Sequence, residues 1–304
     1  MNILITGASG FVGSSLLEHI KFANITAISR SKQVNSENVH WEQLSLKDLI
    51  KSELLITNKY DTVIHLAAKA HALKEHVSLA EYREVNRGQT IALAERLAGN
   101  GMKRFVFISS ICVNGSHTPI GSPFTENTKE HPHSDYAISK FEAEEELKKL
   151  AINMNFELVI IRPPLVYGEN APGNFKNLLN LILKGLPLPF GLVKNSRSFI
   201  SVNNLCDFIA LVAIHSKAAN EFFLISDDEN ISTKKLIKTI WKARKIESFL
   251  IPIPIYIFRV LFKAISRESM SIQLFDNLEV DNYKAKNLLG WIPKETMFDV
   301  FKRS

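Results

Sequence analysis

Tyr136 and Lys140 stand four residues apart, and they form the pair in this sequence that is best suited to proton transfer. Residues four apart in a helix share one face, so the spacing predicts that the two side chains are neighbours. A tyrosine phenol has a pKa of about 10 and is a poor acid or base at neutral pH, but a nearby ammonium group lowers that pKa. The pair therefore predicts an acid/base tyrosine activated by a lysine, as the reduction of a ketone by hydride and proton requires.

A second chemical signal lies at the start of the chain, where three glycines spaced three residues apart follow a short apolar run. An apolar strand, a glycine turn and a helix in this order are typical of a dinucleotide site. The turn lets the backbone approach a pyrophosphate, and the helix amino terminus faces that anion. The residues expected to contact the cofactor here are Gly7, Gly10, Phe11, Val12 and Gly13.

The end of the second predicted strand, residues 25–30, indicates which cofactor binds. NAD-preferring sites usually place an acidic residue there to hold the ribose 2′-hydroxyl, whereas this chain has Ser29, Arg30 and Ser31. An acid would repel a 2′-phosphate, and an arginine flanked by hydroxyls would bind it. We therefore expect these three residues to contact the cofactor and NADP(H) to be preferred. NAD(H), with Arg30 in solvent, is the alternative.

These residues are positioned by a repeated alternation of apolar strands and helices. Further strands are expected at 38–42, 61–68, 104–108 and 157–161, with long helices at 78–99 and from Tyr136 onward. The alternation predicts an α/β fold with a doubly wound parallel Rossmann sheet and right-handed crossovers. Four residues at the ends of two of these strands are expected to line the cofactor site: Leu66, Ala67, Ala68 and Pro163.

The alternation fails beyond residue 162. Helices are expected at 174–184 and 232–244, a short strand at 197–202, and a strand returning to the main sheet at about 221–226. We therefore divide the chain into two parts. Residues 1–165, with the returning strand, form the NADP-binding Rossmann domain, and residues 166–304 form a smaller, interleaved substrate-binding lobe.

The most apolar stretch, residues 249–265, contains two prolines and two basic residues. A membrane span needs about 20 apolar residues, which this stretch does not provide. We expect no integral membrane span, but a turn followed by a buried or partner-facing helix. A helix on a membrane surface is the alternative.

Composition excludes several other classes of protein. An apolar fraction of 46% and a charged fraction of 22% are ordinary for a globular protein, and the net charge of +6 comes from scattered basic residues, which does not favour nucleic acid. The two cysteines, Cys112 and Cys206, lack the spacing of metal ligands, so no metal is expected. Few cysteines and a chain that starts with a strand favour a cytoplasmic enzyme without a signal peptide.

Taken together, the three glycines, Ser110 and the Tyr136–Lys140 pair resemble the short-chain dehydrogenase/reductase superfamily. The 304-residue length and the segment 162–168 (Arg-Pro-Pro-Leu-Val-Tyr-Gly) resemble its extended, nucleotide-sugar branch, the NAD-dependent epimerase/dehydratase family. The resemblance implies that Ser110 hydrogen-bonds the substrate oxygen and that Lys140 also binds the nicotinamide ribose. It further implies a homodimer formed through the helices at 78–99 and 136–149.

The same resemblance implies a UDP-sugar substrate and several contacts to it. Asn174 opens the helix that caps the diphosphate in relatives, and Arg197 matches an arginine that binds the diphosphate region. A guanidinium suits phosphate geometrically. The loop that contains Leu188 and Phe190 would face the uracil. The alternative for Arg197 is a surface salt bridge.

Two relatives are excluded by the residues after Ser110. Sugar-nucleotide 4,6-dehydratases carry Asp-Glu there, and this chain carries Ile111 and Cys112, which cannot do the acid/base work of elimination. GDP-fucose synthase-type enzymes place an epimerising cysteine at the position of Cys112. Their partner histidine would fall near Gly173–Asn174, where none stands, so Cys112 is interpreted as a packing residue.

Three functions remain. Residues 65–68, 109–115, 162–168 and 289–291 resemble bacterial surface-polysaccharide (O-antigen, lipopolysaccharide) enzymes that reduce UDP-2-acetamido-2,6-dideoxy-4-hexulose to UDP-N-acetylquinovosamine. An NADPH-dependent 4-keto-reductase of this type is favoured by Arg30. A UDP-hexose (UDP-GlcNAc or UDP-Glc) 4-epimerase with bound NAD is the alternative. A non-catalytic NADP-sensing regulator is the remote alternative. Such regulators have an incomplete Ser/Tyr/Lys set, whereas Ser110, Tyr136 and Lys140 are all present in this sequence.

Overall fold

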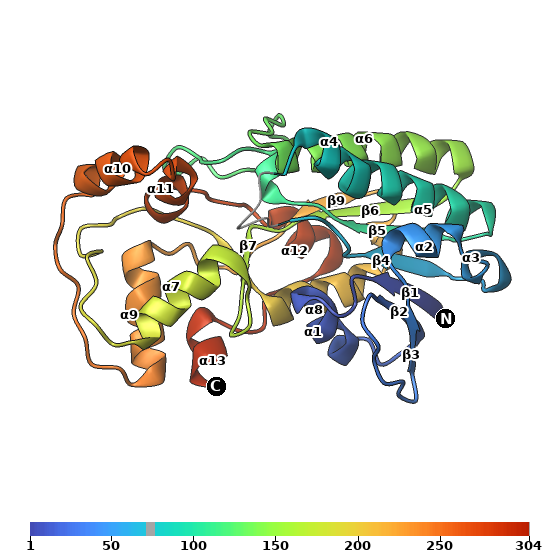
Figure 1. Cartoon of the computed structure of the whole chain (residues 1–304), viewed down its shortest axis with the longest axis horizontal. Helices are drawn as coiled ribbons and strands as arrows, with labels where there is room; N and C mark the ends of the chain where they lie inside the picture. The colour runs from blue at the N-terminus through green and yellow to red at the C-terminus, as the bar shows by residue number, and fades with distance from the viewer. Residues whose placement is uncertain (71–76, 304) are drawn as a thin grey trace.

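Seven parallel strands form one sheet, which lies in the half of the molecule that contains the amino terminus (Figure 1). The computed structural model describes residues 1–70 and 77–303. The order along the sheet is β3-β2-β1-β4-β5-β6-β9, so the direction of winding reverses between β1 and β4. The strands are β1 (Asn2–Thr6), β2 (Asn24–Ser29), β3 (Val39–Gln43), β4 (Thr62–His65), β5 (Arg104–Ile108), β6 (Glu157–Arg162) and β9 (Phe222–Leu224). The predicted doubly wound parallel sheet is confirmed.

Helices cover both faces of the sheet, because alternate residues of each strand are apolar on both sides. On β1, Ile3 and Ile5 pack with α1 and α8, whereas Leu4 packs with α2, α5 and α6. The helices of this half are α1 (Phe11–His19), α2 (Leu46–Lys51), α3 (Leu54–Thr57), α4 (Leu79–Tyr82), α5 (Gln89–Gly99), α6 (Asp135–Met154), α8 (Val202–Val212) and α12 (Tyr283–Leu289).

A second group of elements has a hydrophobic core of its own, to the left of the sheet in Figure 1. A two-stranded parallel sheet, β7 (Leu165–Tyr167) with β8 (Phe199–Ser201), connects it to the main sheet. Its helices are α7 (Gly173–Leu183), α9 (Thr233–Arg244), α10 (Ile255–Ala264), α11 (Glu268–Phe275) and α13 (Met297–Lys302). The strand predicted at 221–226 is β9 and pairs with β6. The division into two domains at residue 165 stays a prediction.

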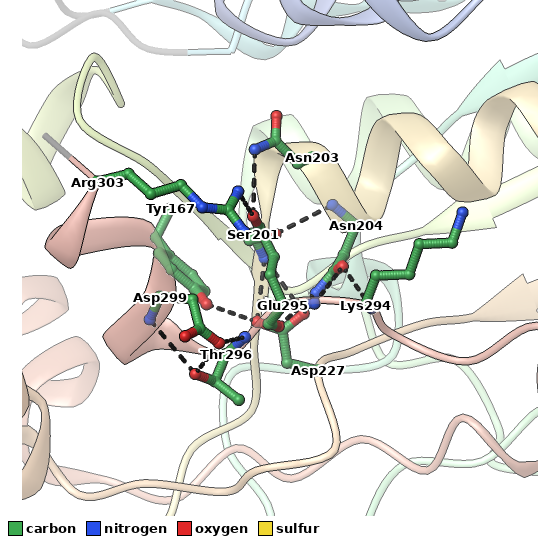
Figure 2. Close-up of polar contacts among 10 residues, drawn as sticks. All are labelled: Tyr167, Ser201, Asn203, Asn204, Asp227, Lys294, Glu295, Thr296, Asp299 and Arg303. Carbon is green, nitrogen blue, oxygen red and sulfur yellow. Dashed lines mark hydrogen bonds and ion pairs between the residues drawn. The ribbon is translucent and has the colours of Figure 1, made fainter.

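The two halves are joined by a buried polar cluster, shown in Figure 2. Tyr167 donates its hydroxyl to Asp227 at 2.7 Å, and Asn204 donates to Asp227 at 2.6 Å and to the carbonyl of Glu295 at 2.9 Å. Arg303 closes the cluster by donating to the Glu295 carboxylate at 3.0 Å. Burial raises the pKa of Asp227 to about 6. The cluster therefore ties β7, α8 and the carboxyl-terminal segment into one body.

Residues 249–265 are the stretch expected to form a turn followed by a buried or partner-facing helix. The turn and the helix α10 are present, but none of the ten residues of α10 is buried. Phe258 and Phe262 are half-buried against the core of the second lobe. Of the two options expected for this helix, burial within the chain is therefore contradicted, and a partner-facing helix stays a prediction. No helix among the described residues is long and apolar enough to cross a bilayer.

Candidate active site

The glycine turn between β1 and α1 has the geometry that a dinucleotide phosphate group needs. Gly7 has a φ of +72°, and a Cβ there would lie 2.8 Å from the amide nitrogen of Ala67. A Cβ at Gly13 would lie 2.3 Å from the Gly7 carbonyl oxygen. Gly10 is the amino-terminal cap of α1, and a Cβ there would meet only that same oxygen, at 3.1 Å. The first and third glycines thus permit close backbone packing, and the second leaves bare backbone at the helix amino terminus.

Three hydroxyls converge at the tip of β2, next to this turn. Ser29 donates its hydroxyl to that of Ser9 at 3.0 Å and lies 3.2 Å from that of Ser31. Ser9 belongs to the glycine turn, so the contact joins the two parts of the predicted cofactor site. Arg30 is exposed beside them. The tip therefore presents hydroxyls and a guanidinium where an acid would stand in an NAD site.

Tyr136 and Lys140 lie on the first turns of α6, as predicted. Ser134 caps this helix by accepting a hydrogen bond from the amide of Ala137 at 3.2 Å. Burial raises the pKa of the Tyr136 phenol, and the nearby hydroxyl of Ser110 opposes that shift. Ser110 and Tyr136 therefore lie near each other, and their roles in catalysis stay predictions.

Ser110 occupies the turn that follows β5. Its hydroxyl accepts a hydrogen bond from the amide of Cys112 at 3.2 Å and caps the 3₁₀ turn η2 (Ile111–Val113). Cys112 lies beside the same hydroxyl, and burial raises the pKa of its thiol. A thiol with a raised pKa is a poor nucleophile, which agrees with its interpretation as a packing residue.

Lys140 is buried, with only 1% of its surface exposed. Its Nζ lies 4.1 Å from the centroid of the Phe107 ring. Burial lowers the pKa of Lys140 to about 7, and the carboxylate of Glu144 opposes this shift. The amine can therefore exchange a proton near neutral pH. The shift in the pKa of Tyr136 has other causes, so activation of the tyrosine by the lysine stays a prediction.

His65, at the end of β4, is buried and has a hydrogen-bond partner at each ring nitrogen. Its Nδ1 lies 2.8 Å from the hydroxyl of Thr6 and its Nε2 lies 2.9 Å from that of Thr90. Burial lowers its pKa to about 3, with a further contribution from the charge of Lys140. The neutral ring therefore links β1, β4 and α5 under the site.

Sequence reasoning missed a buried ion pair beneath the catalytic residues. Glu144, one turn after Lys140, accepts hydrogen bonds from Arg162, including one from Nε at 3.0 Å. Glu144 also accepts a hydrogen bond from the hydroxyl of Ser109. Arg162 donates to the Asn114 side chain at 3.0 Å. The pair connects α6, β6 and both sides of the turn that contains Ser110.

A second missed feature is a π-helical turn, η1 (Arg83–Gly88), between α4 and α5 in the helix predicted at 78–99. The turn directs Asn86 inward, where its amide donates to Ser139 on α6 at 3.1 Å and accepts from the backbone of Lys69 at 2.8 Å. π-turns occur often at functional sites. An asparagine before a glycine in a helix was the available signal in the sequence.

Arg197 lies on the opposite side of the site and is only 7% exposed, so it is not a surface salt bridge. Its guanidinium donates to the carbonyls of Ile272 at 3.2 Å and Asp276 at 2.8 Å. Burial lowers its pKa to about 10, and its charge acts on the Cys112 thiol. The charge of this buried cation thus reaches the Cys112 side of the site, and its contact with a diphosphate stays a prediction.

The remaining predicted substrate residues lie in the second lobe. Asn174 is half-buried at the start of α7 and donates to Gln273 on α11 at 2.8 Å. Leu188 and Phe190 have side chains packed into the core of that lobe. The backbone nitrogen of Leu188 donates to the Phe249 carbonyl at 3.2 Å. Contact of these three residues with a substrate stays a prediction.

The described residues fit a dinucleotide cofactor better than a metal. The bare backbone at Gly10 and the hydroxyls at the tip of β2 suit a diphosphate and a ribose. The buried amine of Lys140 suits a neutral, hydroxyl-bearing ligand. Within residues 1–70 and 77–303, no group of three His, Cys, Asp or Glu side chains could hold a metal ion.

Comparison with known proteins agrees with this geometry. Residues 3–226 match the family described as the NAD dependent epimerase/dehydratase family. The chain is 37% identical to a UDP-glucose 4-epimerase of Vibrio cholerae, an alignment that covers 100% of this chain and 94% of that protein. It is 31% identical to an N-acetyl-α-D-glucosaminyl-diphospho-ditrans,octacis-undecaprenol 4-epimerase of Escherichia coli O157:H7, over 86% of this chain and 80% of that protein.

Among solved structures, the UDP-glucose 4-epimerase of Thermotoga maritima with UDP-glucose has a similar fold. The TM-score is 0.79 at 23% identity, with 99% of this chain and 96% of that chain covered. The resemblance that the sequence indicated is therefore confirmed in both sequence and fold. The chain belongs to the NAD-dependent epimerase/dehydratase family, a group of NAD(P)-dependent enzymes of the extended short-chain dehydrogenase/reductase class.

Proposed function

We propose that the protein is an NADPH-dependent 4-keto-reductase of a UDP-sugar, of the type that converts UDP-2-acetamido-2,6-dideoxy-4-hexulose to UDP-N-acetylquinovosamine for a surface polysaccharide. The observation that supports it best is the chemistry of the tip of β2, where the hydroxyl oxygens of Ser29 and Ser31 lie 3.2 Å apart beside Arg30. Such a group binds a 2′-phosphate and leaves no acid to repel it. NADPH is the cofactor that a net reduction consumes.

The chain's own residues supply the proton and the positioning for this reaction. When bound, the reduced nicotinamide supplies a hydride to the ketone carbon. Tyr136 donates its phenol proton to the carbonyl oxygen as that oxygen gains negative charge, and Ser110 donates a hydrogen bond to the same oxygen. Burial lowers the pKa of Lys140 to about 7, close to neutral pH. In its protonated form Lys140 stabilises the resulting phenolate until a proton returns. Arg197 would hold the diphosphate of the sugar nucleotide.

The test is oxidation of NADPH with the 4-keto sugar, compared with oxidation of NADH. We expect a preference for NADPH in the wild type and a shift toward NADH in Arg30→Asp, because the new carboxylate repels a 2′-phosphate and can bind a 2′-hydroxyl. The matched control is Lys21→Asp, an exposed charge reversal elsewhere in the same half. A wild-type preference for NADH would refute the proposed cofactor.

A second candidate function is 4-epimerisation of a UDP-hexose with bound NAD, and the two relatives above favour it, since both are named as 4-epimerases. The same residues would serve, because an epimerase removes a hydride from C4 and returns it to the other face. An epimerase interconverts UDP-GlcNAc and UDP-GalNAc, or UDP-Glc and UDP-Gal, without added reductant. This turnover without consumption of NADPH would replace the reductase proposal. Tight NADPH binding without either turnover would indicate the non-catalytic regulator.

We also propose a cytoplasmic homodimer. The surface formed by η1 and α6 is held in shape by ion pairs between Arg83 and Glu142 and between Arg87 and Glu146. A preshaped helical face of this kind suits self-association. Sedimentation equilibrium of the purified protein tests the oligomeric state, and a monomer at all concentrations would exclude the dimer.

A further inference from the structure

One end of the second lobe exposes an apolar surface formed by two segments, residues 181–194 and 248–267, which we call the apolar tip. The segments are joined by hydrogen bonds between Leu188 and the backbone of residues 249 and 251. Figure 1 shows α10 at the end of the molecule farthest from the amino terminus. Six large apolar side chains of the tip are more than half exposed: Leu186, Phe249, Tyr256, Val260, Leu261 and Ile265. A surface of this kind marks an interaction site.

Helix α10 shows the anomaly most clearly. Its inner side is apolar, with Phe258 stacked on Phe190 at 6.0 Å between ring centroids and tilted against Phe275 at 5.4 Å. Its outer side is apolar as well, because Tyr256 and Val260 are four residues apart and both face away from the lobe. Arg259 and Lys263, also four residues apart, form a basic stripe along one edge of the helix. An outward apolar side of this kind is normally buried. In α10 the outer half has no partner within the described chain.

The charges around the tip select the partner. The two segments contain five basic residues and no Asp or Glu, and Glu247 and Glu268 adjoin the ends of the second segment. Arg259 is paired with Asp276, a residue outside the two segments, at 2.6 Å. The cations thus outnumber the carboxylates beside them, and a second copy of the chain would place the same excess of positive charge against itself. An anionic bilayer instead offers an apolar interior for the side chains and negative headgroups for the cations.

We propose that the apolar tip docks the protein on an anionic membrane surface, with α10 lying in the interface. Tyr256 has the amphipathic ring that favours the headgroup level. Val260 and Leu261 would enter the acyl boundary, while Lys263 and Arg267 remain among the headgroups. The proposal goes beyond the proposed function and holds for either reaction at C4. It is consistent with an enzyme on the cytoplasmic leaflet, which is the anionic one.

Flotation with lipid vesicles tests this surface. The full-length protein is mixed with vesicles of equimolar phosphatidylcholine and phosphatidylglycerol, or of phosphatidylcholine alone. We expect binding to the anionic vesicles, weakened by salt, and little binding to the neutral ones. Val260→Ser/Leu261→Ser should reduce the vesicle affinity about tenfold through lost apolar burial. Lys263→Gln should reduce it about fivefold through one lost cation.

The matched control is Val34→Ser, which makes the same change at an exposed valine in the other half of the molecule and should leave vesicle binding unchanged. All variants should keep the wild-type thermal midpoint, because the altered side chains are exposed. Absence of wild-type binding, equal binding to both vesicle types, or unchanged binding by the Val260/Leu261 variant would each overturn the proposal. A purified dimer that becomes a monomer in that variant would assign the tip to a second copy and overturn it as well.

Discussion

Replacing Lys140 with methionine should stabilise the cofactor-free protein, by an amount that depends on pH. Lys140 is almost completely buried, and burial lowers its pKa from 10.5 to about 7. Each unit corresponds to about 1.4 kcal/mol, so the buried charge costs about 5 kcal/mol of folding free energy when the amine is protonated in both states. Methionine has a similar length and no charge to bury, so the variant avoids this cost.

The sign of the pH dependence follows from the two pKa values. At about pH 6, the folded and the unfolded chain both hold the proton, and the whole cost of about 5 kcal/mol is present. At about pH 9, the folded chain has released the proton while the unfolded chain keeps it, and the cost falls to about 2 kcal/mol. The stability that Lys140→Met gains over the wild type should therefore shrink by about 3 kcal/mol between these pH values.

Urea unfolding at the two pH values measures this difference, and the emission of the three tryptophans reports the transition. The matched control is Lys148→Met on the same helix, where the side chain is 38% exposed. That variant should differ from the wild type by the same amount at both pH values. A stability difference for Lys140→Met that does not change with pH would refute the reasoning, because it would mean that burial does not depress the pKa of Lys140.

Three further predictions concern the same site. Tyr136→Phe should reduce turnover at least about 10²-fold, measured as NAD(P)H oxidation or epimer formation, and a near-normal rate would contradict its role as the acid/base. Glu144→Gln should destabilise the protein by about 3 kcal/mol in urea unfolding, because Arg162 remains as a buried charge, and Glu144→Gln/Arg162→Met should recover much of that loss; equal stability of the single and double variants would exclude a coupled pair. Gly13→Ala should abolish cofactor binding in a fluorescence titration, since its Cβ would lie 2.3 Å from backbone, whereas Gly99→Ala, with no atom within 4 Å, should bind normally.

The sheet and the common helix of Tyr136 and Lys140 could be predicted because they depend on local patterns. The run Ile3 to Ile5 has no polar face, which fits a strand buried on both sides, and the structure confirms it as β1. Tyr136 and Lys140 share one helix face because they are four residues apart, which helical periodicity alone requires. Ser110 was identified from the family pattern; it lies near Tyr136, and its role stays a prediction.

The parts that sequence could not predict depend on contacts between distant residues. Glu144 stands in an acidic run, Glu142 to Glu146, that indicates a solvated helix face, yet its partner Arg162 comes from β6. The apolar composition of α10 left a buried and a partner-facing helix open, because a periodicity argument cannot tell whether any element of the same chain covers the outer side. The preference between NADPH and NADH is a third case, since it depends on one exposed residue, Arg30.

The buried charges below the site explain how α6 and the Ser110 turn keep their relative position. Lys140 and Glu144 share one face of the helix, the first directed at the site and the second at Arg162. Arg162 in turn holds Asn114, which follows the turn that contains Ser110. Any displacement of that turn relative to α6 must stretch an ion pair that is shielded from water and therefore strong. The position of Ser110 relative to Tyr136 is thus set by interactions beneath the site.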